Sequence, residues 1–363
     1  MALSLLHCPG IWCLTLLLSV LWTAAPLYAG NENHNGVHVQ SGQSIQAAID
    51  AAAPGQTILV EAGTYNEQLT IETDDISLVG LGAVLVPPST PIHNTCSGLA
   101  GPDTEAGICV TGQNVELAPF VTEHEKVLSV GRPVKHVLVT GFEIRGFSGI
   151  NVAVVGAQAT KVVGNQLKDG GQYGCLTVGS TDTHVDGNTV VASDLKFIGI
   201  CADDTPGVQV VNNYVNGYVI GLCVQTSGAV YRHNELVNLC IGAFVDPNIG
   251  GADVSGNHIS NANPACTTIA EVGISGVIID GAVDTTVRHN LIEGLTAGGQ
   301  PNKTAVGVVI IDEPTTDPVA VASGNIVSEN VLRNNDLDIY VQTIGTGNVI
   351  ENNECSSPSE LCG

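Results

Sequence analysis

The sequence predicts an all-β solenoid, in which one short supersecondary unit is stacked many times. The first observation is an Asn-centred phrase between short apolar strands, whose copies lie 21 to 25 residues apart with two longer steps of 33 and 40. The second is a Gly-led apolar strand within each repeat, as in GLCVQ from Gly221 and GVIID from Gly276. Each coil therefore holds at least two strands separated by turns. The Asn anchors are Asn165, Asn188, Asn213, Asn234, Asn257, Asn290, Asn330 and Asn353.

The repeated Asn falls at a turn, where its amide can bond the neighbouring backbone. Identical side chains at one position of stacked strands can also bond one another. We therefore expect these Asn residues to form an amide ladder that runs through the stack.

Residues 36–90 differ from the repeats, because GQSIQAAIDAAAPGQ predicts a helix. Ser44 is the expected N-cap, and Pro54-Gly55 ends the helix. A stack of strands has an exposed apolar end, so an amphipathic helix here is well placed to cap it. Its apolar face comprises Ile45, Ala48, Ile49 and Ala52.

Residues 91–130 have few strand runs and several turn signals, which indicates an insertion from the regular coils. Such insertions commonly build one wall of a groove. Cys96 and Cys109 are expected to close part of this insertion, and Cys355 and Cys362 to staple a C-terminal tail over residues 355–363.

Residues 1–29 contain the apolar run IWCLTLLLSVLWTAA followed by small residues, which predicts a signal peptide and a secreted or extracellular protein (periplasmic in a bacterium). The run is short for a membrane span, so no stable span is expected. Removal of this segment leaves a single domain over residues 30–363 with nine cysteines, one of them unpaired. Cys201 and Cys223 should stack on neighbouring coils, either paired or as buried thiols.

The composition limits the classes of partner. A formal net charge of −24 argues against nucleic acid and against an anionic membrane surface. It also argues against an anionic polysaccharide, unless a divalent cation bridges the two. The sequence contains no C-x-x-C motif, so a structural zinc site has no support. A monomer is expected.

The segment SIQAAIDAAAPGQTILVEAGTYNEQLTI, followed by coils of the V-x-x-N-x-[VIL] type, resembles the right-handed parallel β-helix proteins of the pectin-lyase-like superfamily. The resemblance covers residues 37–354. It implies a right-handed parallel β-helix with an N-terminal capping helix. It leaves the activity open, because the superfamily includes lyases, hydrolases, esterases, epimerases and non-catalytic proteins.

One column of polar residues follows the Gly-led strands. Residues of one repeat position stack roughly 4.8 Å apart, so these carboxylates should lie along one edge and raise one another's pKa, as general acid–base chemistry requires. The alternative is turn chemistry, since each residue also opens a turn such as DDTPG or DPNIGG. The column comprises Asp203 with Asp204, Gln225, Asp246, Asp280 and Asp312, with Gln342 in the last coil.

The motifs of the superfamily are only partly present. Asp203-Asp204 resembles the aspartate pair of polygalacturonase-type hydrolases, but the Arg-x-Lys segment of those enzymes is missing. Arg232, in an Arg-His-Asn phrase that returns at Arg288, resembles the basic residue with which pectate lyases abstract a proton.

We therefore expect a secreted carbohydrate-active protein, a polysaccharide lyase or a glycoside hydrolase acting on an extracellular polysaccharide that could carry uronates. The candidate catalytic residues are Asp203, Asp204, Asp246 and Arg232, and the candidate substrate-binding residues are Lys196, Tyr218, Gln225 and Asp280. No cofactor is assigned with certainty, although an acidic cluster suits Ca²⁺. The alternative is a non-catalytic surface or binding protein of the same fold. Asn302-Lys303-Thr304 is an N-glycosylation sequon.

Overall fold

Parallel pairing between successive coils dominates the computed structural model, which describes residues 36–269 and 273–362. Nearly every strand pairs with the equivalent strand of the coil before and of the coil after, so the chain is a right-handed parallel β-helix, as the repeats predict. The predicted signal peptide, with Cys8 and Cys13, lies outside the described residues.

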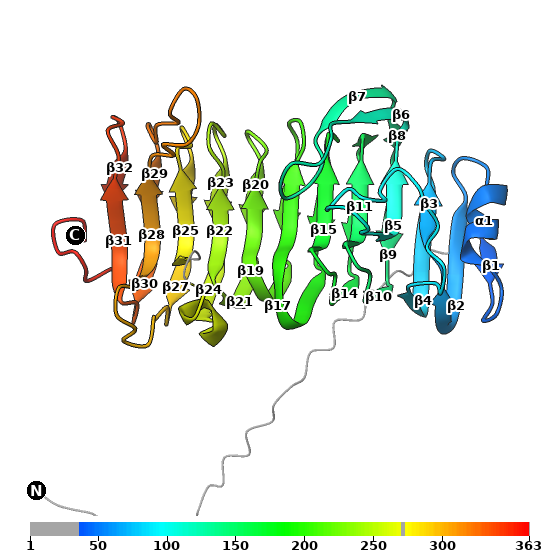
Figure 1. The fold of residues 1–363 in the computed structure, drawn as a ribbon, viewed down its shortest axis with the longest axis horizontal. Helices are drawn as coiled ribbons and strands as arrows, with labels where there is room; N and C mark the ends of the chain where they lie inside the picture. Colours follow the sequence, from blue (N-terminus) through cyan, green and yellow to red (C-terminus); the bar gives the residue numbers. More distant parts are fainter. Residues whose placement is uncertain (1–35, 270–272, 363) are drawn as a thin grey trace, which may run out of the picture. The chain divides into compact units, whose positions relative to one another are not determined.

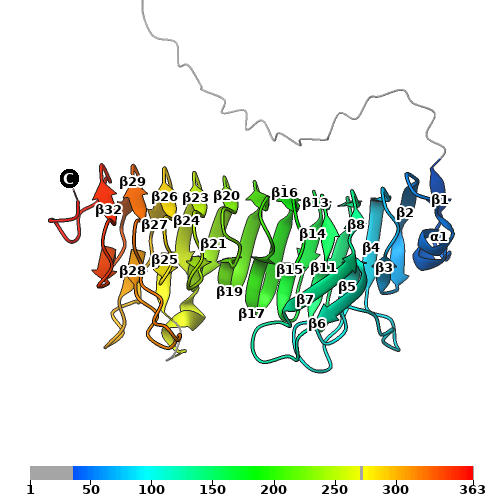
Figure 2. The same cartoon turned by 90° about the horizontal axis from the view of Figure 1, so that it is seen from above.

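The strands form three stacks along the solenoid (Figures 1 and 2). The front stack contains β3 (Leu69–Ile71), β5 (Ala106–Thr111), β11 (Ile150–Val155), β15 (Tyr173–Val178), β22 (Ile241–Val245), β25 (Ile274–Asp280), β28 (Ala305–Ile311) and β31 (Leu337–Gln342). The rear stack contains β1 (Val37–Val39), β9 (Leu138–Thr140), β13 (Lys161–Val163), β16 (His184–Asp186), β18 (Gln209–Val211), β20 (Val230–Arg232), β23 (Asp253–Ser255), β26 (Thr286–Arg288), β29 (Ile326–Ser328) and β32 (Val349–Glu351).

The third stack contains β10 (Glu143–Arg145), β14 (Gln166–Lys168), β21 (Glu235–Leu239), β24 (His258–Ala262), β27 (Leu291–Glu293) and β30 (Val331–Arg333). Four long strands bend from one stack into the next: β2 (Thr57–Asn66), β4 (Ser77–Val86), β17 (Thr189–Asp203) and β19 (Tyr214–Val224). Outside the stacks, β8 (Val134–Lys135) pairs with β12 (Ala157–Gln158), β6 (Gln113–Leu117) pairs with β7 (Val127–Arg132), and η1 (Pro264–Thr267) is a single 3₁₀ turn.

The solenoid interior is narrow and is filled by aliphatic side chains that stack in register. Each coil contributes one inward residue per position, so side chains of similar size pile on one another and few large rings are needed. One such row in the front stack, fully buried throughout, comprises Val152, Cys175, Ile200, Leu222, Ala243, Val277 and Val308.

The predicted amide ladder is confirmed. Asn234, for example, donates from Nδ2 to Oδ1 of Asn257 at 3.0 Å and to the carbonyl of Val210 at 3.0 Å. Its own Oδ1 accepts from both the backbone and the side-chain nitrogen of Asn213 at 3.0 Å. Each amide thus satisfies backbone groups that the turn would otherwise leave buried without a partner.

The predicted helix is also present, as α1 (Ile45–Ala51). Ser44 caps it by accepting a hydrogen bond from the backbone nitrogen of Ala47 at 3.1 Å. Ile45 and Ile49 are buried, and α1 packs against β1, β2 and β3 at the N-terminal end of the stack (Figure 1).

The predicted insertion is interrupted by a regular strand. AGICVT within residues 91–130 forms β5, fully buried between β3 and β11, because its apolar residues continue the front stack. The chain leaves the coils on both sides of β5. Figure 2 shows β6, β7 and their loops outside the stacks. Leu99, Val115 and Val127 from these excursions pack on outward side chains of the front stack, including Leu176 and Ile198, and form a second apolar cluster outside the solenoid.

Four disulfides are present among the described residues: Cys96–Cys109, Cys201–Cys223, Cys240–Cys266 and Cys355–Cys362. The two expected staples are confirmed, and the choice left open for Cys201 and Cys223 is decided in favour of a bond between adjacent coils. Cys175 is the free, buried thiol of the described part of the chain.

The ladder should contribute strongly to stability. We expect Asn234→Ala to lower the free energy of unfolding by about 2 kcal/mol or more, because the substitution leaves buried donors on Asn213 without acceptors. The measurement is urea unfolding with the disulfides intact. The control is Gln209→Ala at an exposed position of the preceding coil, and equal effects of the two substitutions would contradict the role of the ladder.

Candidate functional site

The polar column predicted from the repeats exists in space. Asp203, Gln225, Asp246 and Asp280 occupy the same register position in four consecutive coils, at the C-terminal end of the front-stack strands. The next coil breaks the column, because Ile311 pairs with Asp280. Asp312 therefore stands one residue beyond the column, contrary to the sequence-based expectation.

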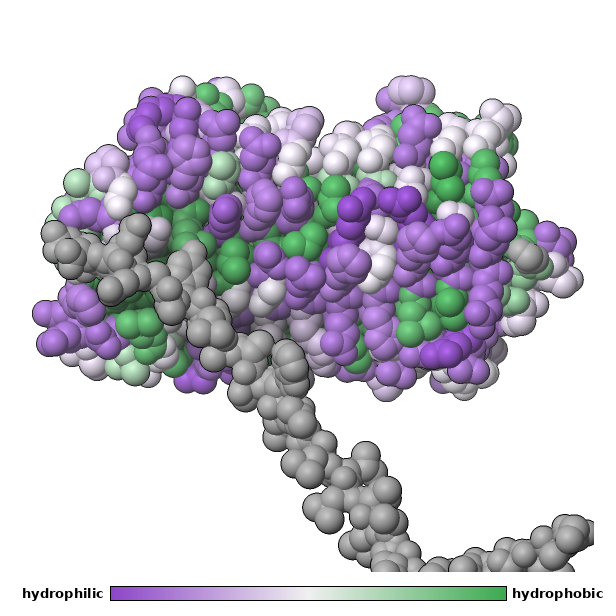
Figure 3. Space-filling view, turned by 180° about the vertical axis from the view of Figure 1, so that it is seen from behind, coloured by the Kyte–Doolittle hydropathy of each residue, from purple (hydrophilic) through white to green (hydrophobic). Residues whose placement is uncertain are grey.

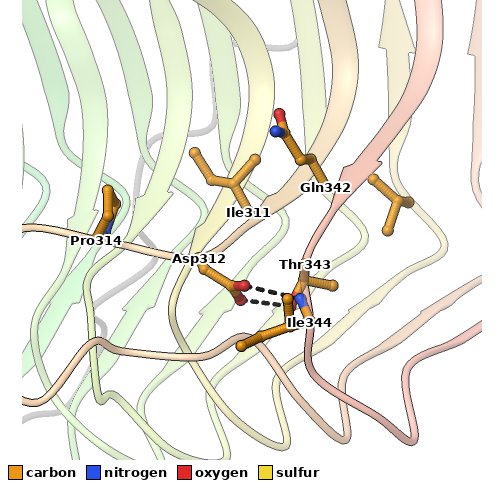
Figure 4. A pocket seen from close by; sticks show the side chains of 7 residues that line it. Ile311, Asp312, Pro314, Gln342, Thr343 and Ile344 are labelled. Carbon is orange, nitrogen blue, oxygen red and sulfur yellow. Dashed lines mark hydrogen bonds between the residues drawn. The ribbon is translucent and has the colours of Figure 1, made fainter.

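Asp312 belongs to a separate hollow at the C-terminal end of the front stack (Figure 4). Its carboxylate accepts hydrogen bonds from the hydroxyl of Thr343 and from the backbone nitrogen of Ile344, the latter at 2.8 Å. Burial raises the pKa of Asp312, but these hydrogen bonds outweigh burial and hold the pKa below its usual range. Asp312 therefore serves turn chemistry, which the sequence had offered as the alternative for the whole column.

The insertion supplies the other half of the site. Glu123, His124 and Lys126, which lie between β6 and β7, reach the polar column from above the front stack. The repeat pattern does not predict any of these three residues, because they lie outside the repeats. The only available signal was the charged run EHEK in a chain with just 13% charged residues.

Asp203 has two side-chain partners from the insertion, His124 and Lys126. Its Oδ2 lies 3.1 Å from Nε2 of His124 and 2.9 Å from Nζ of Lys126. Burial raises the pKa of Asp203, but the hydrogen bonds from His124 and Lys126 outweigh burial and hold the pKa below its usual range. Asp203, whose side chain is 22% exposed, is therefore a carboxylate that stays ionised.

Asp246 has the opposite character. Gln225 donates from Nε2 to Asp246 at 2.6 Å and to Glu123 at 2.7 Å, and accepts from Lys126 at 2.9 Å. Burial, and then the negative charge of Glu123, raise the pKa of Asp246 to about 8 against the opposing hydrogen bond from Gln225. Asp246 is therefore a protonated acid at neutral pH.

Asp280 closes the column. It is 6% exposed, and burial followed by the negative charge of Glu313 raises its pKa to about 6. The column thus contains one carboxylate with a lowered pKa and two with raised pKa values, all at the edge of one stack.

Asp204 does not belong to this surface. Adjacent residues of a strand point to opposite faces, so Asp203 faces outward and Asp204 inward. Oδ1 of Asp204 accepts from the backbone nitrogen of Ser180 at 2.9 Å, and Oδ2 is enclosed without a partner among the described residues. Burial raises the pKa of Asp204 to about 6. The Asp203-Asp204 pair is therefore not a pair of facing catalytic carboxylates.

Tyr218 was expected to bind substrate but is fully buried in the solenoid core. Its register partner on the preceding coil is Lys196, and its hydroxyl lies where a Cβ on Gly174 would meet it at 3.4 Å. The side chain of Tyr218 therefore points inward and cannot contact a substrate on the surface. Lys196 is partly exposed on β17, and its side chain forms no hydrogen bond or ion pair with the column among the described residues.

The structure does not bring Arg232 to the column either. Arg232 lies on β20 of the rear stack and forms an ion pair with Asp253 on β23. Arg288 approaches the same carboxylate at 3.7 Å. The rear surface is mainly hydrophilic (Figure 3), and the recurrence of Arg-His-Asn reflects the repeat position on that surface.

No group of three or more His, Cys, Asp or Glu side chains within residues 36–269 and 273–362 is arranged to hold a metal ion. In the polar column, the ammonium of Lys126 lies between Asp203 and Gln225. In the same ranges, no helix is long and apolar enough to cross a membrane.

Comparisons with known proteins bear on the fold. The chain matches no protein-family model, and no curated protein matches it. Among solved structures, it is similar to DFA-IIIase from Arthrobacter chlorophenolicus A6 without its lid, with 15% identity, a TM-score of 0.57, and coverage of 87% of this chain and 90% of that one. It is also similar to an alginate lyase from Paenibacillus sp. str. FPU-7, with 15% identity, a TM-score of 0.51, and coverage of 85% and 98%. At this identity the likeness establishes the β-helix fold and leaves the activity open.

The inward carboxyl of Asp204 should make stability depend on pH. A raised pKa stabilises the fold below the unfolded value, and that contribution is lost as the pH rises through about 6. Because a shift from 3.8 to about 6 corresponds to about 3 kcal/mol, Asp204→Asn should gain about 2 kcal/mol over the wild type between pH 4 and pH 7.

The measurement is urea unfolding of both proteins at pH 4 and pH 7. The exposed Asp194→Asn is the matched control, since it also removes one negative charge. A constant difference between wild type and Asp204→Asn across this range would contradict the inward placement.

Proposed function

We propose that this protein is a secreted glycoside hydrolase that cleaves a neutral extracellular polysaccharide at the polar column. The observation that carries the proposal is that two carboxyls on one edge have pKa values shifted in opposite directions. The pKa of Asp203 lies below its usual range, and the pKa of Asp246 lies above it. Acid–base cleavage of a glycosidic bond requires two carboxyl groups whose environments give them different pKa values, so that one is protonated while the other is ionised.

The roles follow from these protonation states. Asp246, protonated at neutral pH, donates its proton to the glycosidic oxygen as that bond breaks. Asp203, ionised, accepts a proton from the water that attacks the anomeric carbon. The two residues exchange these protons with solvent before the next turnover.

The spacing favours inversion of configuration. Asp203 and Asp246 are two coils apart, so their backbones lie roughly 9–10 Å apart at about 4.8 Å per coil. Inverting hydrolases separate their carboxyls by about 6.5–9.5 Å, which leaves room for a water molecule. Asp280 is one coil from Asp246, but its burial and raised pKa make it a poor nucleophile.

The charge of the site supports a neutral substrate. The column itself contains three acids, and Glu123 and Glu313 lie beside it. Lys126 is the cation that contacts these groups. A polyuronate would meet net negative charge here. The names of the similar structures, DFA-IIIase and alginate lyase, fit a carbohydrate substrate in general terms.

The test measures activity on neutral glycans, alginate and polygalacturonate, following reducing ends and unsaturated products together. We expect reducing ends from a neutral glycan, without a requirement for Ca²⁺, and inversion at the anomeric carbon by proton NMR. Activity should fall as the pH rises through about 8, because Asp246 then loses its proton. Unsaturated products from a polyuronate would overturn the proposal in favour of a lyase, and inactivity on every glycan would favour a non-catalytic binding protein.

Substitutions distinguish this site from the pair suggested by sequence. Asp203→Asn and Asp246→Asn should each lower kcat by roughly 100-fold or more. Asp204→Asn is the matched control, because its carboxyl points inward, and its kcat should stay within about twofold of the wild type. If Asp204→Asn were as inactive as Asp246→Asn, the assignment of the acid would be wrong.

We also propose export and N-glycosylation. Four disulfides fit an oxidising compartment, and Asn302 and Thr304 of the sequon are exposed in a turn. Expression through a eukaryotic secretory pathway should yield one N-glycan, seen as a mass that falls after treatment with a peptide N-glycosidase. The Asn302→Gln variant should lack this fall, and an unmodified wild type would contradict the proposal.

A further inference from the structure

Asp203 is reached by a buried chain of hydrogen bonds that the reaction itself does not require. Nε2 of His124 lies 3.1 Å from Oδ2 of Asp203, and Nδ1 of His124 lies 3.2 Å from the hydroxyl of Tyr173. We propose that Tyr173 is a positioning residue, which assigns the protons on His124 and thereby holds Asp203 as the base. This inference rests on the proposed function for its kinetic consequence, but its structural content can be tested without any substrate.

The proton on Nε2 follows from the hydrogen bond to Asp203. A carboxylate oxygen only accepts, so a nitrogen 3.1 Å from it must carry a hydrogen. Lys126 lies 3.5 Å from the same nitrogen and donates to the same oxygen of Asp203 at 2.9 Å. Because a protonated Nε2 has no lone pair to accept a hydrogen bond, Lys126 donates to Asp203 and not to His124.

The hydrogen bond to Tyr173 indicates that Nδ1 carries a lone pair and no proton. The phenol is fully buried, and burial raises its pKa, so the oxygen keeps its hydrogen. His124 is the hydrogen-bond partner of this hydroxyl among the described residues. The hydroxyl therefore donates to Nδ1, which must be unprotonated, and each polar group of the chain has a partner.

The surroundings of His124 agree with this arrangement. Its side chain is fully enclosed, with Tyr173 on β15, Asp203 on β17 and Lys126 on its own segment. Phe197 packs edge-on against Tyr173 at 6.1 Å between ring centres, on the ring and away from the hydrogen bond to His124.

This chain of hydrogen bonds decides which oxygen of Asp203 can accept a proton from water. Within the described residues, both side-chain contacts of Asp203 fall on Oδ2, which leaves Oδ1 free to accept a proton from a water molecule. If His124 turned or changed its protonated nitrogen, Asp203 would lose one of the two contacts that fix its orientation. Tyr173 thus controls, through His124, where the base points.

The first experiment is a long-range proton–nitrogen NMR spectrum of the full protein labelled with ¹⁵N-histidine, near pH 7. The His124 signals are identified by their loss in His124→Asn. We expect the wild type to show a protonated Nε2 and an unprotonated Nδ1. Tyr173→Phe, which retains the ring and its packing, should lose this single pattern. Phe197→Leu, which disturbs the packing but retains the hydroxyl, should keep it.

The second experiment uses the neutral glycan identified for the wild type. Tyr173→Phe should lower kcat by roughly 10-fold to 100-fold with KM within about twofold, since the base is misdirected while substrate contacts remain. Phe197→Leu should retain most of kcat. Equal losses of kcat in both variants would overturn the positioning role, because packing alone would then explain them.

The two experiments fail separately. An unprotonated Nε2 in the wild type, or an unchanged pattern in Tyr173→Phe, would overturn the inference whatever the activity of the protein. The expected pattern in a protein that cleaves no glycan would refute the proposed function and leave the proton assignment standing.

Discussion

The stacking of coils in strict register is the constraint on which the rest of this structure depends. Backbone pairing alone would tolerate a slip of one residue, but the buried Asn ladder does not. Each amide bonds the coil before and the coil after, so a slip would leave several buried donors and acceptors without partners. The ladder therefore transmits one register along the whole stack. Side chains far apart in sequence then meet at spacings that the solenoid sets.

The site follows directly from this register. Asp203, Gln225, Asp246 and Asp280 meet because each ends the same strand of successive coils. The coils alone would leave a row of partly buried acids with similar pKa values. The insertion provides that separation, because Lys126 and His124 hold Asp203 ionised while Glu123 opposes ionisation of Asp246. A symmetric repeat thereby acquires an asymmetric centre.

Strand alternation also explains which neighbours of the column are excluded. Asp204 follows Asp203 directly, so its carboxyl enters the interior, where burial raises its pKa. Tyr218 stands before a Gly-led strand and fills the core. Their residue types suited chemistry, but their direction from the backbone decided otherwise.

The sequence by itself determined the solenoid, the Asn ladder, the N-terminal helix with its Ser44 cap, and the alignment of Asp203, Gln225, Asp246 and Asp280. Each of these depends on local pattern or on the repeat period, and both are visible in one dimension. Only the tertiary structure decided that Arg232 lies on the rear stack and that Glu123, His124 and Lys126 complete the site. An insertion has no repeat to place it, and its side chains find the column through packing on the outer apolar cluster. The pKa values likewise depend on burial and on charges from distant segments, which sequence order does not contain.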